Sequence, residues 1–205
     1  MNFISFTQEI SELVKLIVSH PVSHGRWINT LSYLENCGAR KIASCEHPTL
    51  VKEEMLKHAS EEFRHAFYLK KQLVRLGQTY EDYRLEYLLG GWASYHYLNA
   101  LDLQIMRFIR QKKELAYFLV TYAIELRAAE LYPLYQSALR KAGSKVQVQS
   151  ILLEEKEHLA EMEKNLCDQP SLYIQEACRL EALLFKNWLD SVGNDLKELR
   201  SPMIQ

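Results

Sequence analysis

The pattern Glu-x-x-His occurs twice in the chain, as Glu62 with His65 and as Glu155 with His158. Residues three positions apart on an α-helix share one face, so the carboxylate and the imidazole of each pair can converge on one point. Such a pair can bind a metal ion. A single pair on a solvated helix face is ordinary, so the placement of the two pairs matters more than their number.

Each pair follows a further glutamate at a nearly constant distance. Glu35 lies 27 residues before Glu62, and Glu130 lies 25 residues before Glu155. Residues that are equally far from the turn of a helical hairpin lie level with each other. If the chain forms two such hairpins, the rise of about 1.5 Å per residue brings all four carboxylates within about one helical turn of a common level.

Glu125 is the alternative to Glu130 as the third carboxylate. Five positions on a helix rotate a side chain by about 140°, so both residues cannot point into the same site. The symmetry about the turns favours Glu130, and Glu125 is then expected to support a ligand or to pair with an arginine. His58, one turn before Glu62, is expected at the surface or in a supporting position.

This set is typical of a dinuclear metal site in a helix bundle, where two helices supply one Glu each and two others supply Glu-x-x-His. Four buried carboxylates would repel one another, and two divalent cations would balance their charge. Oxygen-rich ligation with two imidazoles suits iron or manganese better than structural zinc. We expect two iron ions, with manganese or a mixed pair as alternatives. The expected ligands are Glu35, Glu62, His65, Glu130, Glu155 and His158.

The composition predicts the helices that must position these residues. Among 205 residues, 48% are apolar but only 7 are Gly and 5 are Pro, which leaves too few turns for an all-β fold. The net charge of −1 excludes a global basic field for nucleic acid. No signal peptide or membrane span is recognised. The four cysteines contain no C-x-x-C pair, so we expect reduced thiols and a cytoplasmic protein.

Capping and breaking residues predict an all-α chain that forms a single domain over residues 1–205, with a core bundle at about 25–167. Ser5, Pro48, Thr79 and Ser144 are the expected helix starts, and Pro133 should bend a helix just past Glu130. The expected helices are 5–19, 25–44, 48–76, 79–110, 113–142, 144–167 and 170–191. Their order is that of a four-helix bundle with one long crossover and additional N- and C-terminal helices.

On these residues the chain resembles the ferritin-like diiron-carboxylate superfamily. The resemblance is carried by Glu35, Glu62-Phe63-Arg64-His65, Glu130 and Glu155-Lys156-Glu157-His158, and it spans about residues 25–167. The stretch 124–130 also resembles the I-E-x-R-x-x-E run of a tRNA hydroxylase that oxidises a prenylated adenosine.

The resemblance implies a diiron oxidase or oxygenase that activates dioxygen to oxidise an organic substrate with an external electron donor. A ferroxidase or peroxidase that handles iron or peroxide is the alternative, and a non-enzymatic helical interaction protein is the second. The substrate class is open between a small molecule and a tRNA-borne group. If metal ions balance four of the 26 acidic side chains, the 25 basic ones outnumber the rest, so an anionic partner is not excluded. A homodimer also stays open.

Overall fold

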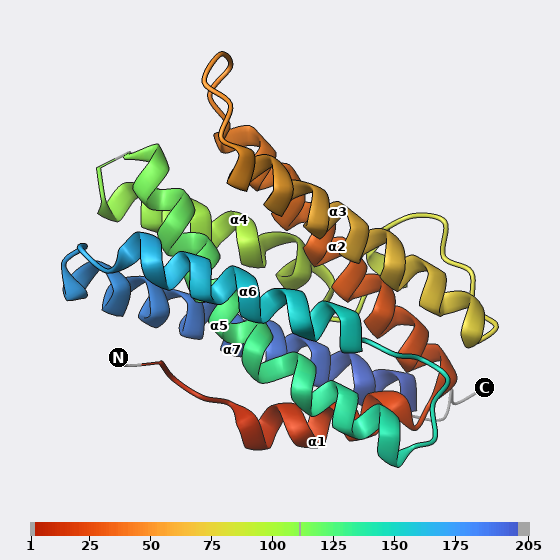
Figure 1. Ribbon diagram of the computed structural model, residues 1–205. Coiled ribbons are helices and arrows are strands. Elements are labelled where there is room, and N and C mark those ends of the chain that lie inside the picture. Colours follow the sequence, from red (N-terminus) through yellow and green to blue (C-terminus); the bar gives the residue numbers. More distant parts are fainter. Residues whose placement is uncertain (1–2, 111, 201–205) are drawn as a thin grey trace.

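The computed structural model describes residues 3–110 and 112–200, and within them it contains helices and no strand. The all-α expectation is confirmed. The elements are α1 (Thr7–Val18), α2 (Pro21–Cys45), α3 (Glu53–Arg75), the short 3-10 helix η1 (Leu85–Tyr87), α4 (Gly91–Phe108), α5 (Lys113–Lys141), α6 (Gln149–Leu166) and α7 (Ser171–Arg200) (Figure 1).

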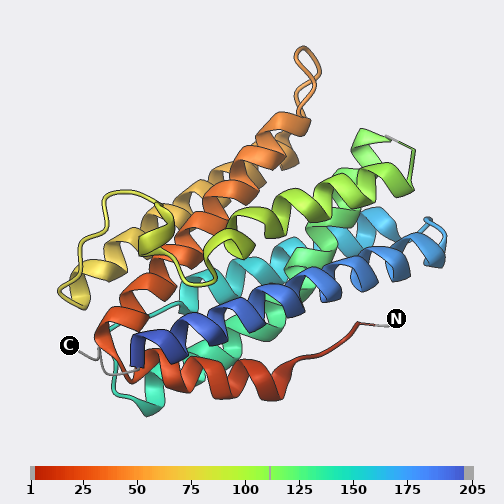
Figure 2. The same cartoon turned by 180° about the vertical axis from the view of Figure 1, so that it is seen from behind.

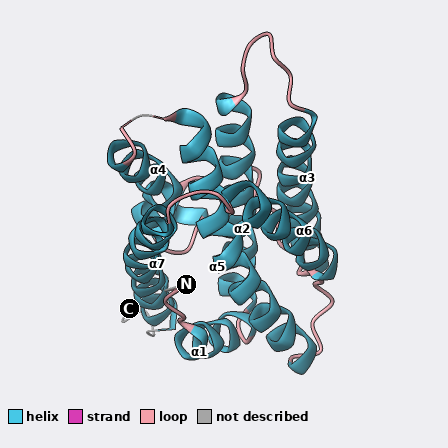
Figure 3. Cartoon of the chain, turned by 60° about the vertical axis from the view of Figure 1, so that its left-hand side comes forward, coloured by secondary structure: helices cyan, strands magenta, loops and turns pink. Residues whose placement is uncertain are grey.

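The helices form packed pairs. α2 packs against α3 and α5 packs against α6, while α4 packs against α7 and α1 lies along α5. Seen from behind, α7 lies between α4 and α1 (Figure 2). Viewed more nearly end-on, α2 and α5 separate the side formed by α3 and α6 from the side formed by α1, α4 and α7 (Figure 3).

The apolar core is divided into two clusters of buried side chains. On α3, Ala59 belongs to one cluster and Leu69 to the other. The same division falls on α6, where Leu152 and Met162 belong to different clusters. The level between them is therefore bounded by apolar packing on both sides, and polar groups placed there are kept from bulk water.

The segment before α4 corrects the expected helix start at Thr79. Residues 76–90 form a loop with η1, and α4 begins only at Gly91, after Gly90 with a φ of 80°. The loop carbonyls find tertiary partners, since Asn29 Nδ2 donates to Asp82 O and Tyr87 O. These bonds satisfy backbone groups that a continuous helix would have satisfied internally.

Two other expected starts, at Pro48 and Ser144, are also wrong. The imidazole Nδ1 of His47 accepts from two backbone N–H groups of the turn that follows, and α3 begins at Glu53 instead of Pro48. The hydroxyl of Ser144 accepts from the Val146 backbone within a turn, and α6 begins at Gln149.

The first and last helices differ from expectation as well. The Ser5 hydroxyl donates to Glu130 Oε1 at 2.5 Å instead of capping α1, which begins at Thr7. The helix α7 continues to Arg200, beyond the expected end at 191. Pro133 lies inside α5, which is assigned as one helix.

In the described part of the chain, no helix has the length and apolar character required to cross a bilayer. All four cysteines are free thiols.

Candidate metal centre

Two overlapping groups of metal-donor side chains lie at the level between the apolar clusters. The His58 group consists of His58, Glu62, Glu125 and His158, and the Glu35 group consists of Glu35, Glu62, His65 and Glu155. Within each group the donor atoms lie within 4.8 Å of one another. Glu62 belongs to both groups, so the two potential ion positions are neighbours that share a carboxylate.

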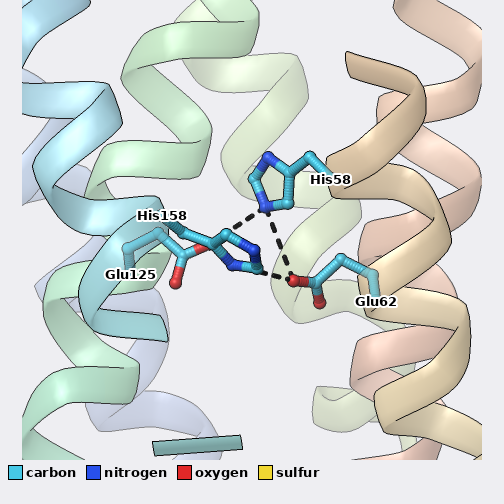
Figure 4. A group of neighbouring side chains, drawn as sticks. All are labelled: His58, Glu62, Glu125 and His158. Atoms are coloured by element: carbon cyan, nitrogen blue, oxygen red, sulfur yellow. Dashed lines mark ion pairs between the residues drawn. The ribbon is translucent and has the colours of Figure 1, made fainter. Parts of the chain in front are cut away.

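Four helices supply these side chains. α3 contributes His58, Glu62 and His65 at positions i, i+4 and i+7, which form one stripe along the helix. Figure 4 shows the stripe residues His58 and Glu62 facing Glu125 of α5 and His158 of α6. The remaining members are Glu35 on α2 and Glu155 on α6. The site therefore depends on the packing of both helix pairs.

Six buried atoms of these two groups lack hydrogen-bond partners. Among the described residues, seven buried side-chain nitrogen or oxygen atoms have none, and six of them belong to these groups. They are His58 Nε2, Glu62 Oε1, His65 Nδ1, Glu125 Oε2, Glu155 Oε1 and His158 Nδ1. An unsatisfied buried polar atom costs about 1–3 kcal/mol, so six at one place fit a site built for cations.

The spacing of the atoms also leaves room for a central ion. His58 Nε2 lies 3.4 Å from Glu62 Oε1 and 3.3 Å from Glu125 Oε1. His158 Nδ1 lies 3.4 Å from the same Glu62 oxygen. These atoms face one another without hydrogen-bond geometry, as donor atoms do around a common metal.

Two outer glutamates orient two of the histidines. His65 Nε2 lies 2.8 Å from Glu154 Oε2, and His158 Nε2 lies 2.9 Å from Glu61 Oε2. Each outer glutamate directly precedes the Glu-x-x-His motif on the opposite helix, so α3 and α6 brace each other's histidines. This contact leaves Nδ1 of each ring facing the site. The signal was in the sequence, because both motifs read Glu-Glu-x-x-His.

His58 corrects the expectation of a surface or supporting position. Only 2% of the residue is exposed, and its Nε2 faces the site while Nδ1 lies 3.0 Å from the Tyr117 hydroxyl. The ring thus presents the opposite nitrogen from His65 and His158. Its spacing of four from Glu62 and seven from His65 could have identified it as part of the same stripe.

Glu130 is placed away from the site, and Glu125 occupies the position expected for it. Glu130 Oε1 accepts from the Phe6 backbone at 2.9 Å and from the Thr7 hydroxyl at 2.8 Å, and its other oxygen pairs with Arg127. Glu130 thus anchors the segment before α1. Equal distance from a turn fixes the level of a residue but not its direction around the helix axis, and the two glutamates differ by about 140° in that direction.

The structure therefore brings together five of the six expected ligands. They are Glu35, Glu62, His65, Glu155 and His158, and His58 and Glu125 join them.

Without metal, the carboxylates and imidazoles hold protons between them. Burial and the charges of Glu62 and Glu155 raise the pKa of Glu35 well above its usual range. Burial alone would lower the pKa of His58, but contacts with Glu125 and Glu62 outweigh it and raise the pKa to about 9. Two divalent cations would replace these protons, because metal ions and protons compete for the same lone pairs.

Contact between His158 and Glu125 shifts the pKa values of the two groups in opposite directions. Burial disfavours the charged imidazole, yet contacts with Glu125 and Glu155 raise the pKa of His158 to about 12. Burial likewise opposes ionisation of Glu125, and contacts with Glu155, His158 and His58 still lower its pKa. The site thus contains concentrated charge of both signs, which is the electrostatic environment expected of a functional cluster.

Tyr132 of α5 supports the partly exposed member of the Glu35 group. Its hydroxyl donates to Glu35 Oε1, and burial together with the Glu35 charge raises the pKa of Tyr132 well above its usual range. Tyr132 therefore keeps its proton and fixes one oxygen of Glu35, leaving the other for the site.

Comparison of the chain with protein-family models, with curated proteins and with solved structures finds no match.

Proposed function

We propose that the two groups hold two iron ions and that the protein is a diiron oxidase or oxygenase. The six donor atoms that face one another without a hydrogen bond carry the proposal. The charges support it, since four carboxylates (Glu35, Glu62, Glu125 and Glu155) would balance two divalent cations. The third imidazole, His58, adds no charge in its neutral form.

The arrangement of the helices supports a ferritin-like bundle. Each of α2, α3, α5 and α6 supplies at least one donor, and α4 lies in the long connection between the two hairpins. In such bundles the metal site is built from side chains on four facing helices. α1 and α7 are then the additional N- and C-terminal helices.

When bound, two ferrous ions supply electrons for the activation of dioxygen, and an external donor must return them. The protein's own residues determine where this happens. His65 and His158 are oriented by Glu154 and Glu61, and Tyr132 holds the proton next to Glu35. The apolar clusters at both ends keep water from the site, which limits loss of reactive species.

An apolar cavity favours oxidation of an organic substrate over storage of iron. It is lined by Glu35, Glu62 and Glu125 and continues between leucine, isoleucine and valine side chains. A route for iron ions would be expected to carry exposed carboxylates, whereas apolar walls suit an organic molecule.

The test is an anaerobic titration of the metal-free chain with Fe(II), followed by exposure to dioxygen. We expect about two ions per chain, because carboxylate and histidine sets contributed by four helices of a bundle bind two cations. Repeated reduction with dithionite should restore dioxygen uptake while the iron stays at that stoichiometry. The Glu62→Ala variant should lose both ions, since Glu62 belongs to both groups.

Glu157→Ala is the matched control, because this glutamate lies on α6 beside His158 but is exposed and belongs to neither group. It should bind iron as the unaltered chain does. Accumulation of many ions per chain after each exposure to dioxygen would support the ferroxidase alternative. A chain that binds no Fe(II), or a Glu62→Ala variant that binds as much as the unaltered chain, would refute the metal centre.

A further inference from the structure

The candidate metal centre opens into a cavity of about 120 Å³ bounded by α2, α4, α5 and α7. The donor residues Glu35, His58, Glu62, Glu125 and Glu155 lie at its inner surface. Most of the remaining wall is apolar. Representative wall residues are Leu31, Leu34, Leu98, Val120, Ile124 and Leu131.

The charged residues of this wall outside the centre are already paired. Lys41 Nζ lies 3.0 Å from Asp102 Oδ2, and both side chains are partly exposed. Arg127 Nη2 lies 2.7 Å from Glu181 Oε2, which is fully buried. An anionic ligand would therefore find no free cation on this part of the wall and would face the carboxylates of the centre, so its desolvation would not be compensated.

Gly38 keeps the part of the cavity next to the centre open. It lies inside α2, one turn after Glu35, and a Cβ at this position would lie 3.7 Å from Glu62 Oε2. A glycine inside a helix costs about 1 kcal/mol relative to alanine. The space left by the missing side chain adjoins the one carboxylate that both groups share.

We propose that this cavity binds an uncharged, predominantly apolar organic molecule and that Gly38 provides the space for its reacting end beside Glu62. That the bound molecule reacts at the metal centre rests on the proposed function. That the cavity binds an apolar molecule does not. The walls supply apolar contact and offer no free cation to an anion, and the Lys41–Asp102 pair lies at the partly exposed side between α2 and α4.

The test measures the binding of hexanol and hexanoate to the metal-free chain by calorimetry. Hexanol should bind at least about tenfold more tightly than hexanoate. Gly38→Leu should weaken hexanol binding by about tenfold or more, because its side chain fills the space beside Glu62. Gly38→Ala should weaken it less and should fold, since its methyl group makes only an ordinary contact.

Gly193→Ala is the matched control. Gly193 is also inside a helix, and a Cβ there would lie 3.9 Å from its nearest neighbour, outside this cavity. This variant should bind hexanol as the unaltered chain does. The proposal would be overturned if hexanol did not bind or if hexanoate bound as tightly as hexanol. It would also be overturned if Gly38→Leu bound hexanol as tightly as Gly193→Ala does.

A second measurement separates this proposal from the metal centre itself. In a chain loaded with Mn(II), the paramagnetic ion should broaden the NMR signals of bound hexanol, whereas Zn(II) should not. If hexanol binds but no metal does, the proposed function fails and the cavity stands. If metal binds and hexanol is not broadened, the cavity proposal fails and the metal centre stands.

Discussion

The His58 group and the Glu35 group share Glu62 but differ in what else they offer a metal ion. The His58 group contains two imidazoles and two carboxylates, whereas the Glu35 group contains one imidazole and three carboxylates. Every member of the His58 group is buried, while 12% of the Glu35 side chain is exposed. The two groups are therefore chemically unequal, one richer in nitrogen and enclosed, the other richer in oxygen and nearer to solvent.

The histidines themselves are also unequal. His65 and His158 are backed by carboxylates, which make an imidazole a stronger ligand. His58 is backed by the neutral hydroxyl of Tyr117. The nitrogen-rich group thus combines one strongly supported and one weakly supported histidine, so its second imidazole does not double its strength.

Among changes that affect only one of the two groups, the largest effect is expected when Glu125, the unshared carboxylate of the His58 group, is removed. Glu125→Ala should reduce binding from about two ions to about one, because the Glu35 group keeps all its donors. Glu130→Ala should keep both ions, because Glu130 binds the N-terminal segment and Arg127. Metal analysis of the two purified variants distinguishes them. Loss of an ion in Glu130→Ala but not in Glu125→Ala would reverse the assignment.

Glu130→Ala should lower the stability of the fold instead of the number of bound ions. It leaves the Arg127 guanidinium with one carboxylate fewer and removes the acceptor for the Phe6 backbone. We expect the free energy of unfolding to fall by about 1–3 kcal/mol, as for other buried groups that lose a partner. Chemical denaturation of the metal-free protein measures this loss, and an unchanged midpoint would contradict the anchoring role.

The next largest effect tests the outer partners of the histidines. Glu61→Ala should weaken binding of the ion held by His158 by about 10- to 100-fold, because the ring loses the carboxylate that orients it. Tyr117→Phe should weaken it less, because His58 loses only a neutral partner. Competition with a chromophoric chelator gives both affinities. Equal losses in the two variants would show that the two histidines of this group are equally supported.

A smaller effect should appear in the choice of metal. Imidazole-rich sites favour Zn(II) over Mn(II) more strongly than carboxylate-rich sites do. With one equivalent of each ion, we expect Zn(II) mainly in the His58 group and Mn(II) mainly in the Glu35 group. The EPR signal of protein-bound Mn(II) should then be lost in Glu35→Ala, and in Glu125→Ala given Mn(II) without Zn(II) it should be retained. The opposite pattern would mean that burial, and not the donor set, controls selectivity.

The sequence predicted most of the residues that lie together in the two groups, but not all of them. Periodicity placed Glu62, His65, Glu155 and His158 correctly, because residues three apart on a helix always share a face. The choice between Glu125 and Glu130 depended on rotation about the helix axis. Packing of α5 against its neighbours determines that rotation, and no local pattern encodes it.

The same division holds for the fold. Long helices were predictable from apolar periodicity and from the scarcity of Gly and Pro. The loop at 76–90 was not, because Asn29 holds its carbonyls from a distant helix. Such a tertiary contact overrides a local capping signal like Thr79.

His24 is also a buried histidine, but its imidazole forms no hydrogen bond to a carboxylate. His24 contacts the Tyr135 hydroxyl at 2.7 Å, and burial lowers its pKa from 6.5 to about 4. Between these values the unfolded chain binds a proton that the folded chain does not. The free energy of unfolding should therefore fall as pH drops through this range, by at most about 1.4 kcal/mol per pH unit.

His58 should give the opposite sign in the metal-free protein, because its neighbouring carboxylates raise its pKa to about 9. Its contribution to stability is present below 6.5 and is lost as pH rises through the folded value. Denaturation curves across both ranges, with His24→Gln and His58→Gln as references, isolate each contribution. If both variants reduce the pH dependence of the free energy of unfolding on the same side of neutrality, the neighbouring carboxylates are not the cause of the different pKa shifts of the two histidines. If they flatten it on opposite sides, equal burial gives opposite protonation because only one ring faces acids.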